Sequence, residues 1–243
     1  MANQKTYLRY RFRRQLLYLL FCVIIAVGIY FYQNRGQAAS SNTTVTFVST
    51  TTNDKDKLAT TGLSKLPVKP ALSTDNYERD KFGGSSWNTW KECNTRQKIL
   101  NRDIKDKKIA ANDCTVISGY LDDPYTGKRI ELKDKSAVAR EVQIDHVVAL
   151  ANAWQTGAQD LTEEQRDQLA NDDLELLAVS SDSNQEKSSS DAAQWLPSNR
   201  AFRCEYVARQ IAIKLKYSLW VTTNEKAAMS KILSTCPSQA LPV

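Results

Sequence analysis

The stretch "EVQIDHVVALANAW", residues 141–154, places the only histidine of the chain among apolar residues. Its apolar run predicts a buried strand from about Ile144 to Leu150. Neighbouring residues on a regular strand point to opposite faces, so Asp145 and His146 can serve one site only if the strand ends or turns there. A lone histidine in such a run is commonly a packed residue, and its role depends on what the sequence places beside it.

The N-terminal segment indicates export. Residues 1–14 carry five basic residues and no acid, and residues 15–32, "QLLYLLFCVIIAVGIYFY", carry no charge. This length is close to the roughly 20 apolar residues of a membrane-spanning helix, whose basic flank stays in the cytoplasm. Two interpretations remain open: a retained signal anchor, or a signal peptide cut near "GQAAS" at 36–40. Either one predicts a protein on the outer side of the cell membrane or a secreted protein.

The net charge of +6 does not describe the expected domain. Residues 1–14 contribute +5 and residues 33–74 contribute +3, so residues 75–243 carry −2. The basic isoelectric point is therefore no argument for a nucleic-acid-binding surface, and any grip on a polyanion must come from local clusters.

Composition divides the exported part in two. Residues 33–74 are rich in Ser, Thr, Asn and Lys and hold one aromatic residue, which predicts a flexible linker. Residues 75–243 form the expected domain. Its four cysteines predict two disulfides, and we favour Cys93–Cys114 and Cys204–Cys236 because each pair closes a short loop. A zinc site is a poor alternative because no C-x-x-C spacing is present.

The remaining patterns predict an α+β domain in which helices dominate the second half. A helix is expected in residues 93–106, a hairpin at 122–132, and a helix at 161–172 that opens on a capping box of Thr162 and Gln165. "LELLAV", residues 174–179, reads as a short buried strand. A short helix before Pro197, an amphipathic helix within 199–220 and a last helix near 225–233 complete the series.

The strand at His146, the strand at 174–179 and the helix after it form a compact ββα unit that suits phosphodiester hydrolysis. That reaction needs a base to deprotonate water and a cation to neutralise charge on the phosphate. A neutral imidazole suits the base at neutral pH. Asp145 and Asn184 offer the carboxylate and amide oxygens that a hard cation such as Mg²⁺ prefers.

These motifs resemble the HNH, or His-Me finger, nuclease superfamily, and more narrowly its exported branch related to the C-terminal domain of GmrSD-type restriction endonucleases. The resemblance covers nearly all of residues 75–243. It implies a ββα-metal finger in a helix-rich domain, with His146 as general base and with Asp145 and Asn184 as ligands of one divalent metal, Mg²⁺ or alternatively Mn²⁺. The motifs that carry it are "YERDKFGG", "CNTRQKIL", "DPYTG", "IDHVVALANAW", "LANDDLELLAV", "WLPSN" and "RCEYVARQIAIKLKYSL".

The chain departs from the family pattern at three places. Glu175 stands where the family usually has an asparagine that braces the finger's backbone by hydrogen bonding, and we count it with His146 and Asn184 among the expected catalytic residues. An ionised Glu accepts hydrogen bonds but cannot donate them, so Glu175 either does not brace the backbone as the asparagine does or has moved toward the metal. Ala149 replaces a common proline and Ser188 a common glycine, and neither change removes a metal ligand or the base.

Several other side chains are candidates for substrate contact. Lys187 lies three residues after Asn184 on one helix face and could bind phosphate, as could Arg203 with its neighbours Arg200 and Arg209. The alternative for each is a solvated surface charge. We expect Trp154 and Trp195 in the core, and Tyr125 and Gly127 in a turn.

The sequence therefore predicts an exported or membrane-anchored, metal-dependent nuclease, with DNA rather than RNA as the expected substrate. Two alternatives remain: an inactive finger that only binds nucleic acid, and a structural surface protein in which His146 is packing. Membrane contact is expected through the N-terminal helix if it is retained. The sequence identifies no protein partner.

Overall fold

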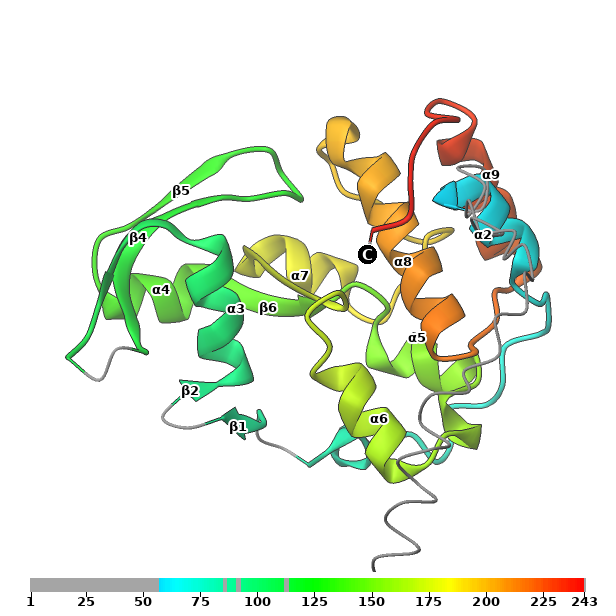
Figure 1. Ribbon diagram of the computed structural model, residues 1–243, viewed down its shortest axis with the longest axis horizontal. Coiled ribbons are helices and arrows are strands. Elements are labelled where there is room, and N and C mark those ends of the chain that lie inside the picture. The colour runs from blue at the N-terminus through cyan, green and yellow to red at the C-terminus, as the bar shows by residue number, and fades with distance from the viewer. Residues whose placement is uncertain (1–56, 85–86, 91–92, 112–113, 243) are drawn as a thin grey trace, which may run out of the picture. The chain divides into compact units, whose positions relative to one another are not determined.

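The computed structural model describes four stretches of the chain, residues 57–84, 87–90, 93–111 and 114–242 (Figure 1). The predicted basic and apolar segments at 1–14 and 15–32 lie outside these residues. Within the described stretches, no helix is long and apolar enough to cross a membrane.

The fold is α+β, as predicted. Its described strands form three small antiparallel sheets: β1 (Thr89–Trp90) with β2 (Cys93–Asn94); β3 (Lys105–Ile109), β4 (Val116–Asp122) and β5 (Arg129–Leu132); and β6 (Val142–His146) with β7 (Leu176–Ser180). The described α-helices are α2 (Ala59–Lys65), α3 (Thr95–Asp103), α4 (Lys135–Glu141), α5 (Leu150–Gln155), α6 (Glu163–Ala170), α7 (Ser181–Lys187), α8 (Arg203–Lys216) and α9 (Thr223–Leu233). Short 3-10 turns are η2 (Arg79–Phe82), η3 (Ala158–Asp160) and η4 (Arg200–Phe202).

The β6–β7 pair and α7 form the predicted ββα unit. The two strands pair from Val142 with Ser180 to His146 with Leu176, and α7 begins at the next residue, where the Ser180 side chain caps its first turn. The prediction that β6 continues to Leu150 is wrong, because β6 ends at His146 and Leu150 already begins α5. An apolar run buried on all sides has no alternation that would reveal where a strand gives way to a helix.

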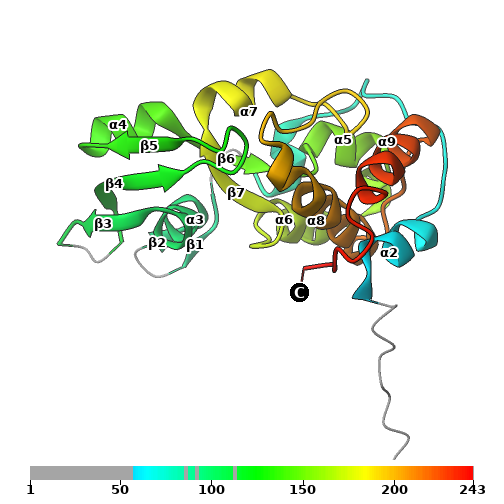
Figure 2. The ribbon, with the colours of Figure 1, turned by 90° about the horizontal axis from the view of Figure 1, so that it is seen from above.

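Apolar side chains pack on both faces of the β6–β7 pair. Ile144 and Leu176 face a cluster that α3, α4 and β4 complete, whereas Leu177 and Val179 face a cluster built around α8. Figure 2 shows the pair between these two groups of elements. A third cluster joins α5, α6 and the end of η2. Burial on two faces fixes the strand that carries His146.

The domain begins earlier than the predicted boundary at residue 75. The helix α2, in the predicted linker, packs on α8 and α9 and buries Ala59, Leu63 and Leu66. The backbone also joins the C-terminal segment, where Leu241 N–H donates to Lys57 O at 2.7 Å. The described residues 57–74 therefore belong to the domain, because a few well-spaced apolar residues suffice to dock a segment that is polar on average.

Both predicted disulfides are confirmed. Cys93–Cys114 joins β2 to the segment just before β4, and Cys204–Cys236 joins α8 to the segment after α9.

Candidate active site

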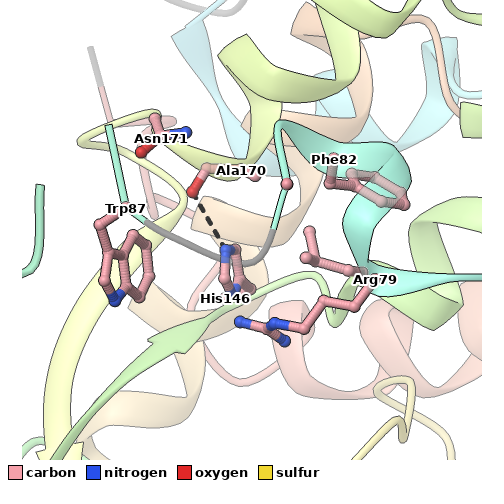
Figure 3. A pocket seen from close by; sticks show the side chains of 8 residues that line it. Arg79, Phe82, Trp87, His146, Ala170 and Asn171 are labelled. Carbon is pink, nitrogen blue, oxygen red and sulfur yellow. Dashed lines mark hydrogen bonds between the residues drawn. The ribbon is translucent and has the colours of Figure 1, made fainter. Parts of the chain in front are cut away.

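His146 lies at the end of β6 and is almost fully buried. Its Nε2 is 3.0 Å from the carbonyl oxygen of Ala170, and the Trp87 ring lies parallel to the imidazole with 5.6 Å between ring centres (Figure 3). A carbonyl only accepts hydrogen bonds, so Nε2 carries the proton and Nδ1 of the neutral ring holds a free lone pair. The local contacts thus select the tautomer that a general base requires at Nδ1.

The protonation state of His146 follows from its surroundings. Burial lowers the pKa of the imidazole to about 3, and the positive charges of Arg79 and Lys187 act in the same direction. The hydrogen bond with Ala170 opposes this shift without overcoming it. His146 is therefore neutral at physiological pH.

The imidazole lines a cavity of about 50 Å³. A water molecule needs roughly 10–15 Å³ of such volume, so a few waters or one phosphoryl group can enter. Arg79 is exposed and points its guanidinium toward His146 from η2 (Figure 3). It makes no hydrogen bond or ion pair with any residue that the structure describes. The other lining residues are Phe82, Gly84, Trp87, Leu150, Ala170 and Asn171.

The η2 turn, which carries Arg79 on one side of the cavity, and Asn88 after it are held by hydrogen bonds to α6. Arg166 donates from Nε to Lys81 O at 2.8 Å, and the Asn88 amide donates to both carboxylate oxygens of Asp167 at 2.9 and 2.7 Å. Gly83 ends η2 with a φ of 92°, and a side chain there would overlap Asp167. These contacts fix the backbone of η2, from which the Arg79 side chain extends.

Sequence reasoning missed Arg79, Trp87 and Asn171. Arg79 lies in the quoted motif "YERDKFGG", and an exposed arginine in a polar stretch has no spacing that marks it as functional. The glycine pair after it was the available signal, because Gly83 requires a left-handed backbone and a close approach of α6.

The short loop after His146 is fastened by buried polar groups. Val147 N–H donates to Glu175 O at 2.8 Å, and Val148 N–H lies 3.2 Å from both side-chain oxygens of Glu175. The Gln210 amide donates to Val147 O at 2.8 Å. Glu175 is fully buried and burial raises its pKa well above the usual value. Glu175 therefore braces the backbone of the loop as an acceptor and does not face a metal ligand.

Asp145 faces away from the His146 cavity. Its Oδ1 accepts from Lys187 Nζ at 2.9 Å and its Oδ2 accepts from the Tyr125 hydroxyl, and the side chain is almost fully buried. Burial raises the pKa of Asp145 although Lys187 opposes the shift. Asn184 lies on the same side of the unit, where its amide donates to Gln143 Oε1 at 2.7 Å.

This arrangement does not fit the predicted metal ligands. Both carboxylate oxygens of Asp145 already accept hydrogen bonds, one from the Tyr125 hydroxyl and one from the Lys187 ammonium. The cation beside Asp145 is therefore Lys187. Among the described residues, no group of three or more His, Cys, Asp or Glu side chains is placed to hold a metal ion. Metal dependence therefore stays a prediction of the sequence resemblance.

The predicted phosphate ligands lie elsewhere. Lys187 is fully buried, which corrects the prediction that it contacts phosphate. Arg203 donates from Nε to Pro197 O at 2.7 Å, and Arg209 donates to Leu174 O at 2.9 Å, so both tie backbone segments together away from the cavity. Arg200 is exposed on η4 and does not line the cavity.

The predicted aromatic and turn residues pack as expected in part. Trp154 is buried in the core, in the cluster of α5 and α6. Trp195 is partly buried and packs against the cluster around α8, where its ring centre lies 5.0 Å from that of Tyr125. Gly127 closes the β4–β5 turn with a φ of 72°. Tyr125 does more than shape this turn, because its hydroxyl reaches Asp145.

Comparison with known proteins places the site within a family. A family model described as "GmrSD restriction endonucleases, C-terminal domain" matches residues 94–232, which include the whole ββα unit. An "Uncharacterized secreted protein" of Arthroderma benhamiae is 38% identical over 177 residues, 72% of this chain and 82% of that protein. No solved structure matches the chain.

Proposed function

Because the chain belongs to the family of GmrSD restriction endonuclease C-terminal domains, we propose that it hydrolyses phosphodiester bonds in nucleic acid. One observation carries the proposal: a neutral, oriented histidine and an arginine that makes no hydrogen bond or ion pair with the described residues line the same cavity. The first supplies a base and the second supplies a site for an anionic oxygen.

The geometry supports a division of labour between these two side chains. Arg79 binds the non-bridging oxygens of the phosphodiester and stabilises the charge that grows on them in the transition state. His146 accepts the proton of the attacking water at Nδ1 as the water oxygen bonds to phosphorus and the P–O bond to the leaving sugar oxygen breaks. The leaving oxygen takes a proton from solvent water, and Ala170 O holds Nε2 and keeps the ring in place. Binding of the anion compensates the charge of Arg79 and so raises the pKa of His146, which makes the imidazole a stronger base once substrate is present.

Metal dependence on Mg²⁺ or Mn²⁺ is the part of the sequence prediction that this geometry supports least. To hold such an ion, Asp145 would have to release Lys187 or Tyr125, whereas the bond of Asn184 to Gln143 uses its amide N–H and not its carbonyl oxygen. The steps above are therefore assigned to His146 and Arg79 alone.

We propose that the domain acts outside the cell. Its two disulfides are typical of oxidising compartments, and the relative from Arthroderma benhamiae is described as secreted. The choice between a retained anchor and a cleaved signal peptide concerns residues outside the described part. DNA as the preferred substrate also remains an expectation.

The test is an incubation of the oxidised protein with supercoiled plasmid and with RNA, in Mg²⁺, in Mn²⁺ and in EDTA. We expect cleavage by the wild type and a loss of about 10²- to 10⁴-fold in His146→Ala, the range for removal of a positioned base. The matched control is Arg200→Ala, which changes an exposed residue outside the cavity. A wild type that binds both nucleic acids without cleaving either would favour the binding-only alternative.

A further inference from the structure

A buried ion pair of Lys187 and Asp145 lies on the far side of β6 from the cavity, and the proposed reaction does not use it. The side chains of Lys187 and Asp145 form an ion pair with 0% and 5% exposure, and the two charged atoms are 2.9 Å apart. Removing a lone charge from water costs several kcal/mol, so such a pair persists only when its remaining hydrogen-bonding groups are also satisfied.

The remaining hydrogen-bonding groups of the ion pair are satisfied by the backbone of His146 and by the hydroxyl of Tyr125. Lys187 Nζ donates a second hydrogen bond to the backbone oxygen of His146 at 2.8 Å, and the Tyr125 hydroxyl donates to the other oxygen of Asp145. The pair therefore joins three places: α7, the end of β6 and the β4–β5 turn.

Lys187 completes the frame around the loop after His146. It holds the carbonyl of His146, Gln210 holds the carbonyl of Val147, and Glu175 holds the amide of Val148. These three side chains come from α7, from α8 and from the residue before β7. Each peptide group that sets the direction of the imidazole thus has a buried partner.

The same contacts exclude a second cation from Asp145. A Mg²⁺ ion at its usual distance of about 2.1 Å from Oδ1 would lie within a few ångströms of the ammonium, in a buried environment where like charges repel strongly. The side chain of Lys187 has no exposed surface through which it could leave.

We propose that Asp145 and Lys187 form a permanent internal ion pair that positions His146, with the ammonium of Lys187 in the place of a metal ion. This inference rests on the proposed function only for the role of His146. Lys187 and Asp145 are positioning residues, because they act through the backbone of His146 and do not touch the cavity.

The first experiment measures metal binding and needs no activity. The oxidised full-length chain is titrated with Mn²⁺ while the imidazole resonance of its single histidine is recorded, in the wild type and in Asp145→Asn. We expect no difference between the two proteins, either in Mn²⁺ bound or in broadening of the resonance. Mn²⁺ binding that broadens the resonance in the wild type and is lost in Asp145→Asn would overturn the proposal.

The second experiment measures positioning. Lys187→Met keeps most of the shape and removes the ammonium, and Lys214→Met is its matched control because Lys214 is also fully buried, in an ion pair with Glu225. We expect Lys187→Met to shift the His146 resonance and to lower kcat by about 10- to 100-fold with little change in KM, as loss of a supporting contact does. Lys214→Met should lower the melting temperature and leave kcat and the resonance unchanged.

If Lys187→Met does not fold, the double variant Asp145→Asn with Lys187→Met removes both charges and the cost of an unpaired one. It should fold, with the His146 resonance still shifted. A resonance and kcat equal to wild type in either folded variant would overturn the positioning role. A wild type that cleaves no nucleic acid would contradict the proposed function alone, because the resonance and Mn²⁺ measurements stand without turnover.

Discussion

His146 combines three properties that packing alone does not require. The ring is almost fully buried, yet it lines a cavity; one nitrogen is fixed by a carbonyl; and Arg79, which has no hydrogen bond or ion pair within the described part of the chain, lies beside it. A histidine that only fills space needs none of these neighbours. The cost of keeping a polar ring in the core is offset here by the hydrogen bond with Ala170.

The protonation of His146 gives a direct prediction. Because burial holds its pKa at about 3, the imidazole of the folded, substrate-free protein should not titrate between pH 5 and 8, whereas the unfolded chain should titrate near 6.5. The chain has a single histidine, so its NMR resonance can be followed without assignment. A midpoint near 6.5 in the folded protein would show that the ring is open to water.

The same shift makes stability depend on pH. The folded pKa lies below the unfolded one, so between pH 6.5 and about 3 the unfolded chain binds a proton that the folded chain does not. The contribution of His146 to the free energy of unfolding should therefore fall as the pH drops through this window, by up to about 1.4 kcal/mol per pH unit. Subtracting the pH profile of His146→Asn from that of the wild type isolates this slope, and an identical profile in the variant would contradict it.

Arg79 should affect both substrate binding and the base. Arg79→Ala removes the group proposed to bind the phosphodiester, and we expect kcat/KM to fall by about 10²- to 10³-fold, as for loss of one charge-stabilising donor. The substitution should also raise the pKa of His146, because the positive charge of Arg79 lowers it. Arg200→Ala is the control for loss of an exposed arginine, and equal behaviour of the two variants would remove Arg79 from the site.

At the scale of elements, the ββα unit was predictable and its ends were not. The sequence indicated both strands, the helix after them and both disulfides, because apolar periodicity, capping residues and loop length are local signals. It did not reveal that β6 stops at His146 or that Lys187 turns inward. Those outcomes depend on Glu175, Gln210 and Tyr125, which are distant in sequence and meet the loop only in the folded chain.

Glu175 braces the loop after His146 through the amide of Val148. Glu175→Gln keeps the size of the side chain and an oxygen acceptor for the amide of Val148, so it should leave folding and cleavage nearly unchanged. Glu175→Leu removes the acceptor and leaves a buried amide unsatisfied, at a cost of about 1–3 kcal/mol. Denaturant unfolding and cleavage rates of the two variants decide the matter: equal stability would mean that Glu175 does not brace the loop.

Over the whole domain, the helix α2 is part of the structure that supports α8, which in turn carries Gln210. Composition predicted a linker here, because the many Ser, Thr and Lys residues outnumber the apolar ones that dock. The buried pair of Lys214 with Glu225 ties α8 to α9 on the same side of the domain.

The boundary can be tested by comparing chains that begin at residues 57 and 75. The shorter chain loses Leu63 and Leu66 from the core, and each buried leucine contributes about 1.5–3 kcal/mol. We therefore expect the shorter chain to be less stable by about 3–6 kcal/mol in denaturant unfolding. Equal stability of the two chains would mean that α2 packs on the domain without supporting it.

The proposed role of His146 as the base can be tested by chemical rescue. His146→Gly leaves a space at the end of β6 that free imidazole can enter from the cavity. We expect this variant to cleave nucleic acid at least about 10²-fold more slowly than the wild type, and we expect added imidazole to restore part of the rate. If His146→Gly cleaves as fast as the wild type without imidazole, His146 is not the base.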